Sequence, residues 1–334
     1  MAATMDDRRR DEIVAWLPGQ LGHADFTLTP ASADASFRRY FRVSGAWGSH
    51  VVMDAPPEQE PCDAFIAISR TLHSIGLNVP RVLAHESERG FLLLTDLGSV
   101  SYLERLDEQS ADGLYGDACK ALLRLQRYGP RSGLPSYDRE RLLGEMRLFE
   151  SWYLSRHRQY SPAPSQLAEL QQVYEHLIES ALAQPQCCVH RDYHSRNLMV
   201  CPNGKAQCCN PGILDFQDAV VGPITYDLVS LFRDCYITWP QQRVEDWVLE
   251  YRNRLRSSGL ATGRDEAEFL RWFDWMGVQR HLKVAGIFAR LWHRDGKGRY
   301  LADLPLTLHY IASVASRYPE LEPLLQFPGV ERIG

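Results

Sequence analysis

The sequence predicts an α+β protein in two parts: a small antiparallel β-sheet with one helix, followed by a larger and mainly helical part. Short β-branched and aromatic runs separated by turn residues occupy roughly the first 95 positions. Apolar residues at helical spacing dominate most of the rest. The 334 residues also exceed the size of one average domain. We therefore divide the chain into domains at 1–95 and 96–334.

Composition excludes several classes of protein. Lys and Arg number 37 and Asp and Glu 42, so the formal net charge is −5, and 45% of residues are hydrophobic. Such a chain is neither disordered nor coiled-coil nor collagen-like. Its mild acidity argues against a nucleic-acid binder, which would carry a basic stripe. The charged N-terminal segment is unlike a secretory signal, and no apolar run is long enough to span a membrane. We expect a cytoplasmic monomer.

The first part is expected to begin with a short amphipathic helix whose apolar face carries Ile13, Trp16, Leu17 and Leu21. The basic run 8–10 would lie in solvent at its start. The strands and the further helix that follow are predicted, in chain order, at 26–29, 37–43, 50–54, 60–75 (the helix), 81–85 and 90–94.

The second part shows three helical stripes, short strands, and then more helices. The stripes lie within 114–125, 142–153 and 167–181, the strands within 184–216 around a turn at 202–205, and the later helices within 226–318.

Two vicinal cysteine pairs, Cys187-Cys188 and Cys208-Cys209, raise the question of a zinc site. Zinc ligands are usually two to four residues apart, and neighbours on a strand point to opposite faces. Small buried apolar residues are the favoured interpretation.

Residues 189–200, Val-His-Arg-Asp-Tyr-His-Ser-Arg-Asn-Leu-Met-Val, carry the clearest chemical pattern. Asp192 is followed five residues later by Asn197, and Asp215 comes near a predicted strand end. One carboxylate to orient and deprotonate an acceptor hydroxyl, and an amide oxygen with a second carboxylate to hold Mg²⁺, suffice for phosphoryl transfer from ATP. Ordinary capping and turn formation is the alternative for each of the three.

This pattern, H-R-D-x-H-x-x-N followed by L-D-F-x-D, resembles the aminoglycoside phosphotransferase branch of the kinase-like fold. The resemblance implies a bilobal fold with ATP and Mg²⁺ as cofactors. Segment 91–98 resembles the last strand and hinge, so that the backbone of Thr95, Asp96 and Leu97 would bind adenine. Segment 222–228 resembles G-x-P-x-x-D-L, whose Asp227 would anchor the catalytic loop.

Four further segments resemble the bacterial anomeric kinases of N-acetylmuramate and N-acetylglucosamine, which phosphorylate the C1 hydroxyl during recycling of cell-wall sugars. The segments are 34–42, 52–57, 231–236 and 279–290. The resemblance implies a small amino sugar as partner. The alternatives are a kinase for an aminoglycoside, choline or another alcohol, and a pseudokinase that only binds nucleotide.

One departure from the kinase pattern concerns phosphate binding. The third strand reads Val-Val-Met-Asp over 51–54 and lacks the lysine that usually grips the phosphates. We hypothesise that at least one of Arg38, Arg39 and Arg42 replaces it. The small residues before them, together with Ser36 and Phe37, would cradle phosphate with backbone N–H groups.

The sugar pocket is expected in the helical part, between the catalytic loop and the later helices. Its candidates lie on the second predicted helix and near the end of the helix that follows Asp227, and core packing or a surface ion pair is the alternative for each. The candidates are Glu145, Trp152, Arg233 and Asp234, with Arg233 suited to the lactyl carboxylate of N-acetylmuramate. His194 has a structural and a substrate-contacting interpretation, and Asp218 is either a second metal ligand or a cap. His190, Trp272 and Trp275 are expected to be structural.

Overall fold

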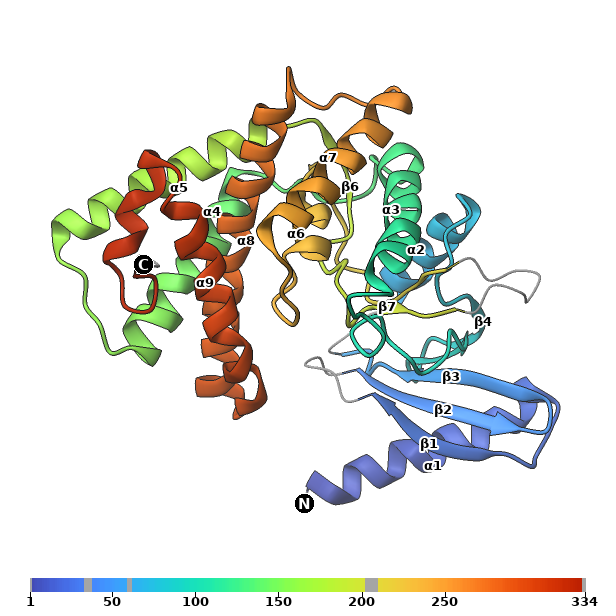
Figure 1. Ribbon diagram of the computed structural model, residues 1–334. Helices are drawn as coiled ribbons and strands as arrows, with labels where there is room; N and C mark the ends of the chain where they lie inside the picture. The colour runs from blue at the N-terminus through green and yellow to red at the C-terminus, as the bar shows by residue number, and fades with distance from the viewer. Residues whose placement is uncertain (1, 33–37, 59–61, 202–209, 332–334) are drawn as a thin grey trace. The chain divides into compact units, whose positions relative to one another are not determined.

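The computed structural model describes residues 2–32, 38–58, 62–201 and 210–331 (Figure 1). The chain separates into two compact units. Residues 1–101 and 198–217 form the first, and residues 102–197 and 218–334 form the second.

The first unit contains a five-stranded sheet with the order β1-β2-β3-β5-β4. All neighbouring strands are antiparallel, which confirms the predicted sheet. The strands are β1 (Thr27–Ser32), β2 (Arg39–Gly45), β3 (Gly48–Asp54), β4 (Val82–Glu86) and β5 (Phe91–Thr95). A tight turn joins β2 to β3, and there Gly48 has φ of 116°, a value that residues with a side chain rarely adopt.

The helix α1 (Ala2–Leu21) packs its apolar stripe against one face of this sheet (Figure 1). Ile13 and Leu17 are fully buried with Phe41 and Val52, as the amphipathic pattern predicted. The helix α2 (Asp63–Ser74) follows β3.

The prediction that the basic run 8–10 lies in solvent is wrong for Arg9. This side chain is 20% exposed and pairs with the fully buried carboxylate of Asp54, and it also donates to the carbonyl of Arg89 at 2.7 Å. The reason is helical spacing, because Arg9 lies one turn before Ile13 on the buried face.

Two short strands, β7 (Leu198–Met199) and β8 (Gly212–Ile213), also belong to the first unit. The N–H of Val200 donates to Val100, and that of Ile213 to Asn78, each at 2.8 Å. These bonds connect the ends of β7 and β8 to residues 78 and 100 of the first unit, whereas the predicted division after residue 95 places both strands in the second part. The predicted turn at 202–205 and the Cys208-Cys209 pair lie outside the described residues.

The second unit is mainly helical, and its first helices match the three predicted stripes. They are α3 (Ala111–Tyr128), α4 (Arg139–Leu148) with the π-helix η1 (Phe149–His157), and α5 (Pro164–Ala183). Later come α6 (Tyr226–Phe232), α7 (Gln241–Ser257), α8 (Glu266–Asp295), η2 (Gly298–Asp303), α9 (Leu304–Ala315) and η3 (Pro319–Gln326). Strands β6 (Gln186–Val189) and β9 (Val220–Pro223) form an antiparallel pair.

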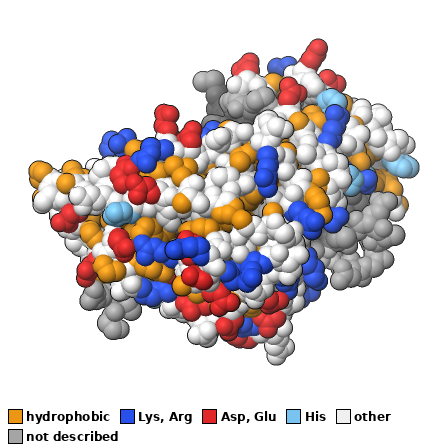
Figure 2. Space-filling model, turned by 90° about the horizontal axis from the view of Figure 1, so that it is seen from above, with side chains coloured by type: hydrophobic (Ala, Val, Ile, Leu, Met, Phe, Trp, Pro, Cys, Tyr) orange, Lys and Arg blue, Asp and Glu red, His pale blue; other side chains and the backbone are white. Residues whose placement is uncertain are grey.

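The centre of the second unit is α8, which packs against η1, α4, α5, α6 and α9 (Figure 1). Trp275 on α8 is buried, as expected, whereas Trp272 is half-buried. Cys187 and Cys188 are both buried in β6, which confirms their interpretation as small apolar residues. Among the described residues, no helix is long and apolar enough to cross a membrane. On the face in Figure 2, basic and acidic side chains are interspersed.

Candidate active site

The catalytic loop, residues 190–197, leaves the end of β6 and is held at its start by Asp227 of α6. The backbone N–H groups of His190 and Arg191 donate to the two carboxylate oxygens of Asp227, at 2.7 and 2.9 Å. Arg191 has φ of 77°, a left-handed conformation that costs a residue with a side chain about 1–2 kcal/mol. These two hydrogen bonds therefore hold a strained backbone in place. They are the contacts expected of Asp227 as an anchor of this loop.

Asp234 holds the far side of the same loop. Its Oδ2 accepts from the N–H of Ser195 at 2.9 Å and from the Ser195 hydroxyl, and its Oδ1 accepts from the N–H of Tyr236 at 3.2 Å. The residue is 1% exposed. Both carboxylate oxygens of Asp234 are thus engaged in shaping the loop, and its predicted place in the sugar pocket stays a prediction.

Within the loop, the carbonyl of Asp192 accepts two hydrogen bonds at 3.0 Å, from the N–H of His194 and from Nδ2 of Asn197. The Asn197 N–H in turn donates to the carbonyl of His194 at 2.9 Å. Because the amide nitrogen of Asn197 faces the loop, its amide oxygen is turned away from that carbonyl. An amide oxygen that points out of the loop is the kind of ligand that a hard cation such as Mg²⁺ prefers.

Asp215 lies in the first unit, two residues after β8. It too is left-handed, with φ of 62°, and it accepts a hydrogen bond from Nε2 of Gln217 at 2.7 Å. The neighbouring Phe216 is fully buried and packs on Phe65 with ring centres 4.9 Å apart. Aspartate tolerates this backbone conformation better than most residues, and the buried phenylalanine fixes the segment that carries it.

Basic groups of the second unit surround the candidate base. Burial acts to raise the pKa of Asp192, but the charges of neighbouring basic groups, that of Lys283 foremost, outweigh burial, so its pKa lies below its ordinary value. Asp192 is therefore ionised at neutral pH. Lys283 and Arg280 were missed from the sequence as site residues. Their spacing of three on a helix with many apolar residues was the available signal, since it places both on one face.

Glu145 lies in a largely buried ionic cluster. It pairs with Arg191 of the catalytic loop and with Lys283 at 3.3 Å, and it accepts from the Tyr137 hydroxyl. Burial would raise the pKa of Glu145, but the charges of Lys283 and Arg191 lower it below its ordinary value. Glu145 therefore holds Arg191 of the loop, and its predicted contact with substrate stays a prediction.

Arg233 contacts residues of α8. It is 5% exposed, pairs with Asp274 of α8 at 2.5 Å, and stacks over Phe273 with its guanidinium carbon 4.5 Å from the ring centre. Its Nη2 is paired, whereas its buried Nη1 has no hydrogen-bond partner among the described residues, so a role for Arg233 toward a lactyl carboxylate stays a prediction. Trp152 is half-buried in η1, and its role remains a prediction.

The two histidines of the loop are both buried. The Nδ1 atom of His190 accepts from the N–H of Asp192 at 3.3 Å, in keeping with a structural role. His194 lies edge-on to Tyr236 with ring centres 5.4 Å apart. Burial lowers the pKa of His194, so it is neutral at physiological pH.

The predicted hinge is built around Asp96. Its carboxylate accepts from Arg42 at 2.7 Å, from the Ser49 hydroxyl at 2.8 Å and from the N–H of Gly98 at 2.9 Å. The Thr95 hydroxyl accepts from the N–H of Arg81 at 2.9 Å, and the Leu97 carbonyl accepts from the Cys201 thiol at 3.4 Å.

The three candidate phosphate-binding arginines are not equivalent. Arg39 pairs with Asp54 at 2.5 Å on the face covered by α1, whereas strand alternation places Arg42 on the other face. Ser36 and Phe37 lie outside the described residues.

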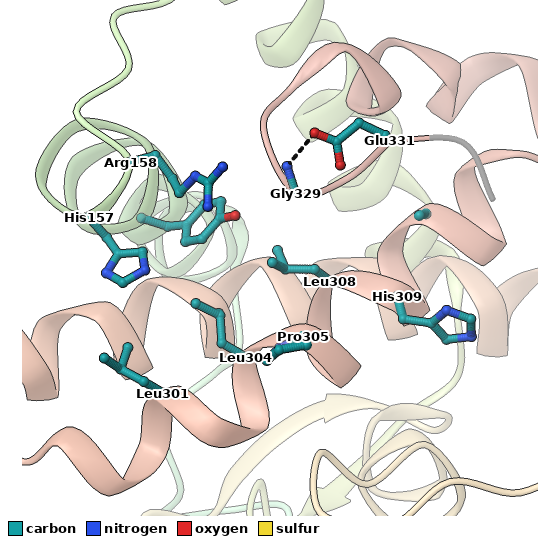
Figure 3. Close-up of a pocket in the computed structure, with 11 residues that line it drawn as sticks. His157, Arg158, Leu301, Leu304, Pro305, Leu308, His309, Gly329 and Glu331 are labelled. Carbon is teal, nitrogen blue, oxygen red and sulfur yellow. Dashed lines mark hydrogen bonds between the residues drawn. The ribbon is translucent and has the colours of Figure 1, made fainter.

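A separate pocket of about 470 Å³ opens between η1, α9 and the C-terminal segment (Figure 3). Leucines from η2 and α9 line it with His157, Arg158 and Glu331. None of the site residues predicted from the sequence lies in its wall.

Comparison with known proteins decides the family. The model of the phosphotransferase enzyme family matches residues 27–270. The chain belongs to this family. This phosphotransferase is 48% identical to the N-acetylmuramate/N-acetylglucosamine kinase of Pseudomonas putida, over 95% of each chain. Proteins of the same name from Pseudomonas aeruginosa and Caulobacter vibrioides are 44% and 30% identical, over 96% and 92% of this chain and 96% and 93% of theirs.

Solved structures show the fold of this phosphotransferase. The ADP-bound aminoglycoside phosphotransferase APH(2'')-Ib has a TM-score of 0.58 at 16% identity, covering 90% of this chain and 97% of its own. The choline kinase LicA of Streptococcus pneumoniae has a TM-score of 0.63 at 12% identity, covering 93% and 99%. The expected kinase-like fold is confirmed.

Proposed function

We propose that the protein is an ATP-dependent kinase that phosphorylates the C1 hydroxyl of N-acetylmuramate and N-acetylglucosamine and releases the sugar 1-phosphate. The observation that carries the proposal is likeness along the whole chain. Relatives at 48%, 44%, 42% and 30% identity, each covering at least 92% of the sequence, share the name N-acetylmuramate/N-acetylglucosamine kinase. Recycling of cell-wall sugars is the corresponding process, and the cytoplasm, where ATP is available, is the proposed compartment for the monomer.

Asp192 is the proposed catalytic base. Its carboxylate, kept ionised by neighbouring cations, accepts the C1 proton while the anomeric oxygen attacks the γ-phosphorus of ATP. The bond from that phosphorus to the bridging oxygen breaks, and ADP leaves. An anomeric hydroxyl is more acidic than an ordinary alcohol, so positioning and charge neutralisation carry most of the rate enhancement.

Asn197 and Asp215 are the proposed Mg²⁺ ligands. An amide oxygen and a carboxylate are a fitting donor set, and the orientation of the Asn197 amide supports it. Leu198, the residue bonded to Asn197, pairs with Ile213, two residues before Asp215, and this pairing links the two segments. When bound, Mg²⁺ neutralises charge on the phosphates.

For the nucleotide, the backbone of Thr95, Asp96 and Leu97 is proposed to bind adenine. At least one of Arg38, Arg39 and Arg42 is proposed to reach the phosphates. Changing all three to Gln should then raise the KM for ATP severalfold, and an unchanged KM would refute this part of the proposal.

The test is turnover of purified protein with ATP and a panel of acceptors: the two amino sugars, an aminoglycoside and choline. Both amino sugars should give ADP and an acid-labile phosphate, and the product should lose its reducing end because C1 is blocked. A phosphorylated product that still reduces would refute C1 transfer. Preferential turnover of the aminoglycoside or choline would refute the sugar assignment.

Asp192→Asn should lower kcat by about 10²–10⁴-fold, the usual contribution of a positioned base. Asp246→Asn, the same change on the surface of α7, serves as control and should leave kcat unchanged. Near-normal turnover by folded Asp192→Asn would contradict the assigned role.

A further inference from the structure

One cation of the catalytic loop differs from all its basic neighbours. Arg196 directly precedes Asn197 and follows Asp192 by four residues. Its guanidinium carbon lies 3.5 Å from the centre of the Tyr236 ring, and its side chain remains 40% exposed. The guanidinium is thus stacked on an aromatic face while its edge stays accessible to solvent.

The other basic groups around the loop are less exposed than Arg196, and each has a contact of its own. Arg233 is bound to Asp274, Arg191 and Lys283 share Glu145, and Nη1 of Arg280 lies 3.6 Å from the Cys235 thiol. The side chains of Arg191, Lys283 and Arg233 are 16%, 9% and 6% exposed, against 40% for Arg196.

The nearest acid to Arg196 forms only a loose pair with it. The closest approach of Nη2 to the Asp303 carboxylate is 3.6 Å, longer than the 2.7–3.2 Å of a hydrogen bond. Among the residues that the structure describes, no group accepts a hydrogen bond of ordinary length from this guanidinium. Arg196 is therefore a partly exposed cation whose donors are available.

Asp234 fixes the backbone on both sides of the stack between Arg196 and Tyr236. Asp234 accepts from Ser195, the residue before Arg196, and from the N–H of Tyr236, which supplies the ring. His194 packs edge-on against the same ring. A stacked, preoriented guanidinium loses little conformational freedom when it binds, and its fork of donors matches a carboxylate at two points.

We propose that Arg196 is the carboxylate-binding residue of the acceptor site and sets the preference for an acidic over a neutral amino sugar. This inference rests on the proposed function. N-acetylmuramate and N-acetylglucosamine share the ring, the N-acetyl group and the C1 hydroxyl, and only the former carries a lactyl carboxylate. With the acidic sugar, Arg196 binds that carboxylate. With the neutral sugar, Asp303 balances the charge of Arg196, so both remain substrates.

The test compares the two sugars within one enzyme. The measured quantity is the ratio of kcat/KM for N-acetylmuramate to kcat/KM for N-acetylglucosamine. Arg196→Gln should lower this ratio about tenfold or more, since a charge-assisted contact is lost for one sugar only. Arg196→Lys keeps the positive charge but not the planar pair of N–H donors, so it should lower the ratio less than Arg196→Gln does. Arg139→Gln, which removes an exposed arginine on α4, is the control and should leave the ratio unchanged.

Asp303→Asn provides a second measurement with the opposite sign. Removing the competing carboxylate should raise the ratio severalfold, chiefly through a lower KM for N-acetylmuramate. If Arg196→Gln changes the ratio by less than about twofold, whether both activities fall together or neither falls, the inference is overturned. Failure of the proposed function would look different, since the wild-type protein would then phosphorylate neither sugar, and the inference would fall with it.

Discussion

Carboxylates stabilise both units, but they bind different partners. In the second unit, Asp227 and Asp234 accept hydrogen bonds from backbone N–H groups of the catalytic loop and the turn after α6. In the first unit, Asp54 accepts from the side chains of Arg9 and Arg39, and Asp96 accepts chiefly from Arg42 and Ser49.

The difference follows from what fixes the backbone in each place. The backbone of the sheet strands is already held by hydrogen bonds between the strands. Asp54 therefore only connects side chains of α1 and β2, whose backbones do not depend on it. Residues 190–197 have no ladder, and Arg191 is strained, so acids from elsewhere in the chain determine the path of the loop. Loss of a sheet carboxylate should therefore cost stability, whereas loss of a loop carboxylate should also cost rate.

The largest effect within this comparison is expected for Asp227→Asn. An asparagine has one acceptor oxygen, so one backbone N–H would face an NH₂ group and the strained Arg191 conformation would lose half its support. We expect kcat to fall about 100-fold, in the range lost when catalytic groups are misplaced by about 1 Å. The free energy of unfolding should fall by about 2 kcal/mol.

Asp138→Asn is a matched control, because Asp138 also accepts from a backbone N–H, that of Arg141 at 3.0 Å. It caps α4, where asparagine and aspartate are equivalent, so kcat and stability should both be retained. Equal loss of rate in the two variants would remove the distinction between loop and cap carboxylates.

Glu145→Gln should give the next largest effect, and mainly on stability. It removes the carboxylate that the largely buried side chains of Lys283 and Arg191 share, a change that costs about 3 kcal/mol. The pKa of Glu145 is lowered on folding, so its stabilisation is complete above its ordinary pKa and is lost as the pH falls through the lower folded value. Wild type and variant should therefore differ most at neutral pH and converge in acid.

Urea unfolding across this pH range measures the difference. Glu175→Gln removes an exposed pair with Arg139 and should change the free energy of unfolding by less than about 0.5 kcal/mol. A constant difference between wild type and Glu145→Gln at all pH values would show that the ionic pairs of Glu145 contribute nothing.

The smallest expected change in rate belongs to Asp54→Asn. Its two arginine partners, Arg9 and Arg39, are 20% and 28% exposed, so water can solvate their charges in part once the carboxylate is gone. The free energy of unfolding should therefore fall by about 1–2 kcal/mol. At saturating ATP and at a temperature where the protein stays folded, kcat should be unchanged. A loss of rate comparable to that of Asp227→Asn would refute the contrast between the units.

Sequence reasoning found the parts of the site that depend on local spacing. The fold class, the order of strands and helices along the chain, and the loop motif around Asp192 all follow from short-range pattern. The ion pairs of Arg233 and Glu145 could not be predicted in this way. Their partners, Asp274 and Lys283, lie on α8, at least 41 residues away in the chain. The contacts of Asp234 could not be predicted either, because it lies beyond the end of α6, where helical spacing no longer fixes the direction of a side chain.

The dependence of the loop on distant acids also sets an order of events during synthesis. Asp227 follows His190 by 37 residues and Asp234 follows Ser195 by 39, and Lys283 of α8 comes later still. As the chain emerges from the ribosome, the sheet strands can pair while the catalytic loop is still without the groups that shape it. Nascent chains that end before α6 would thus carry the whole catalytic motif in their sequence and none of its geometry, so activity should arise late in translation.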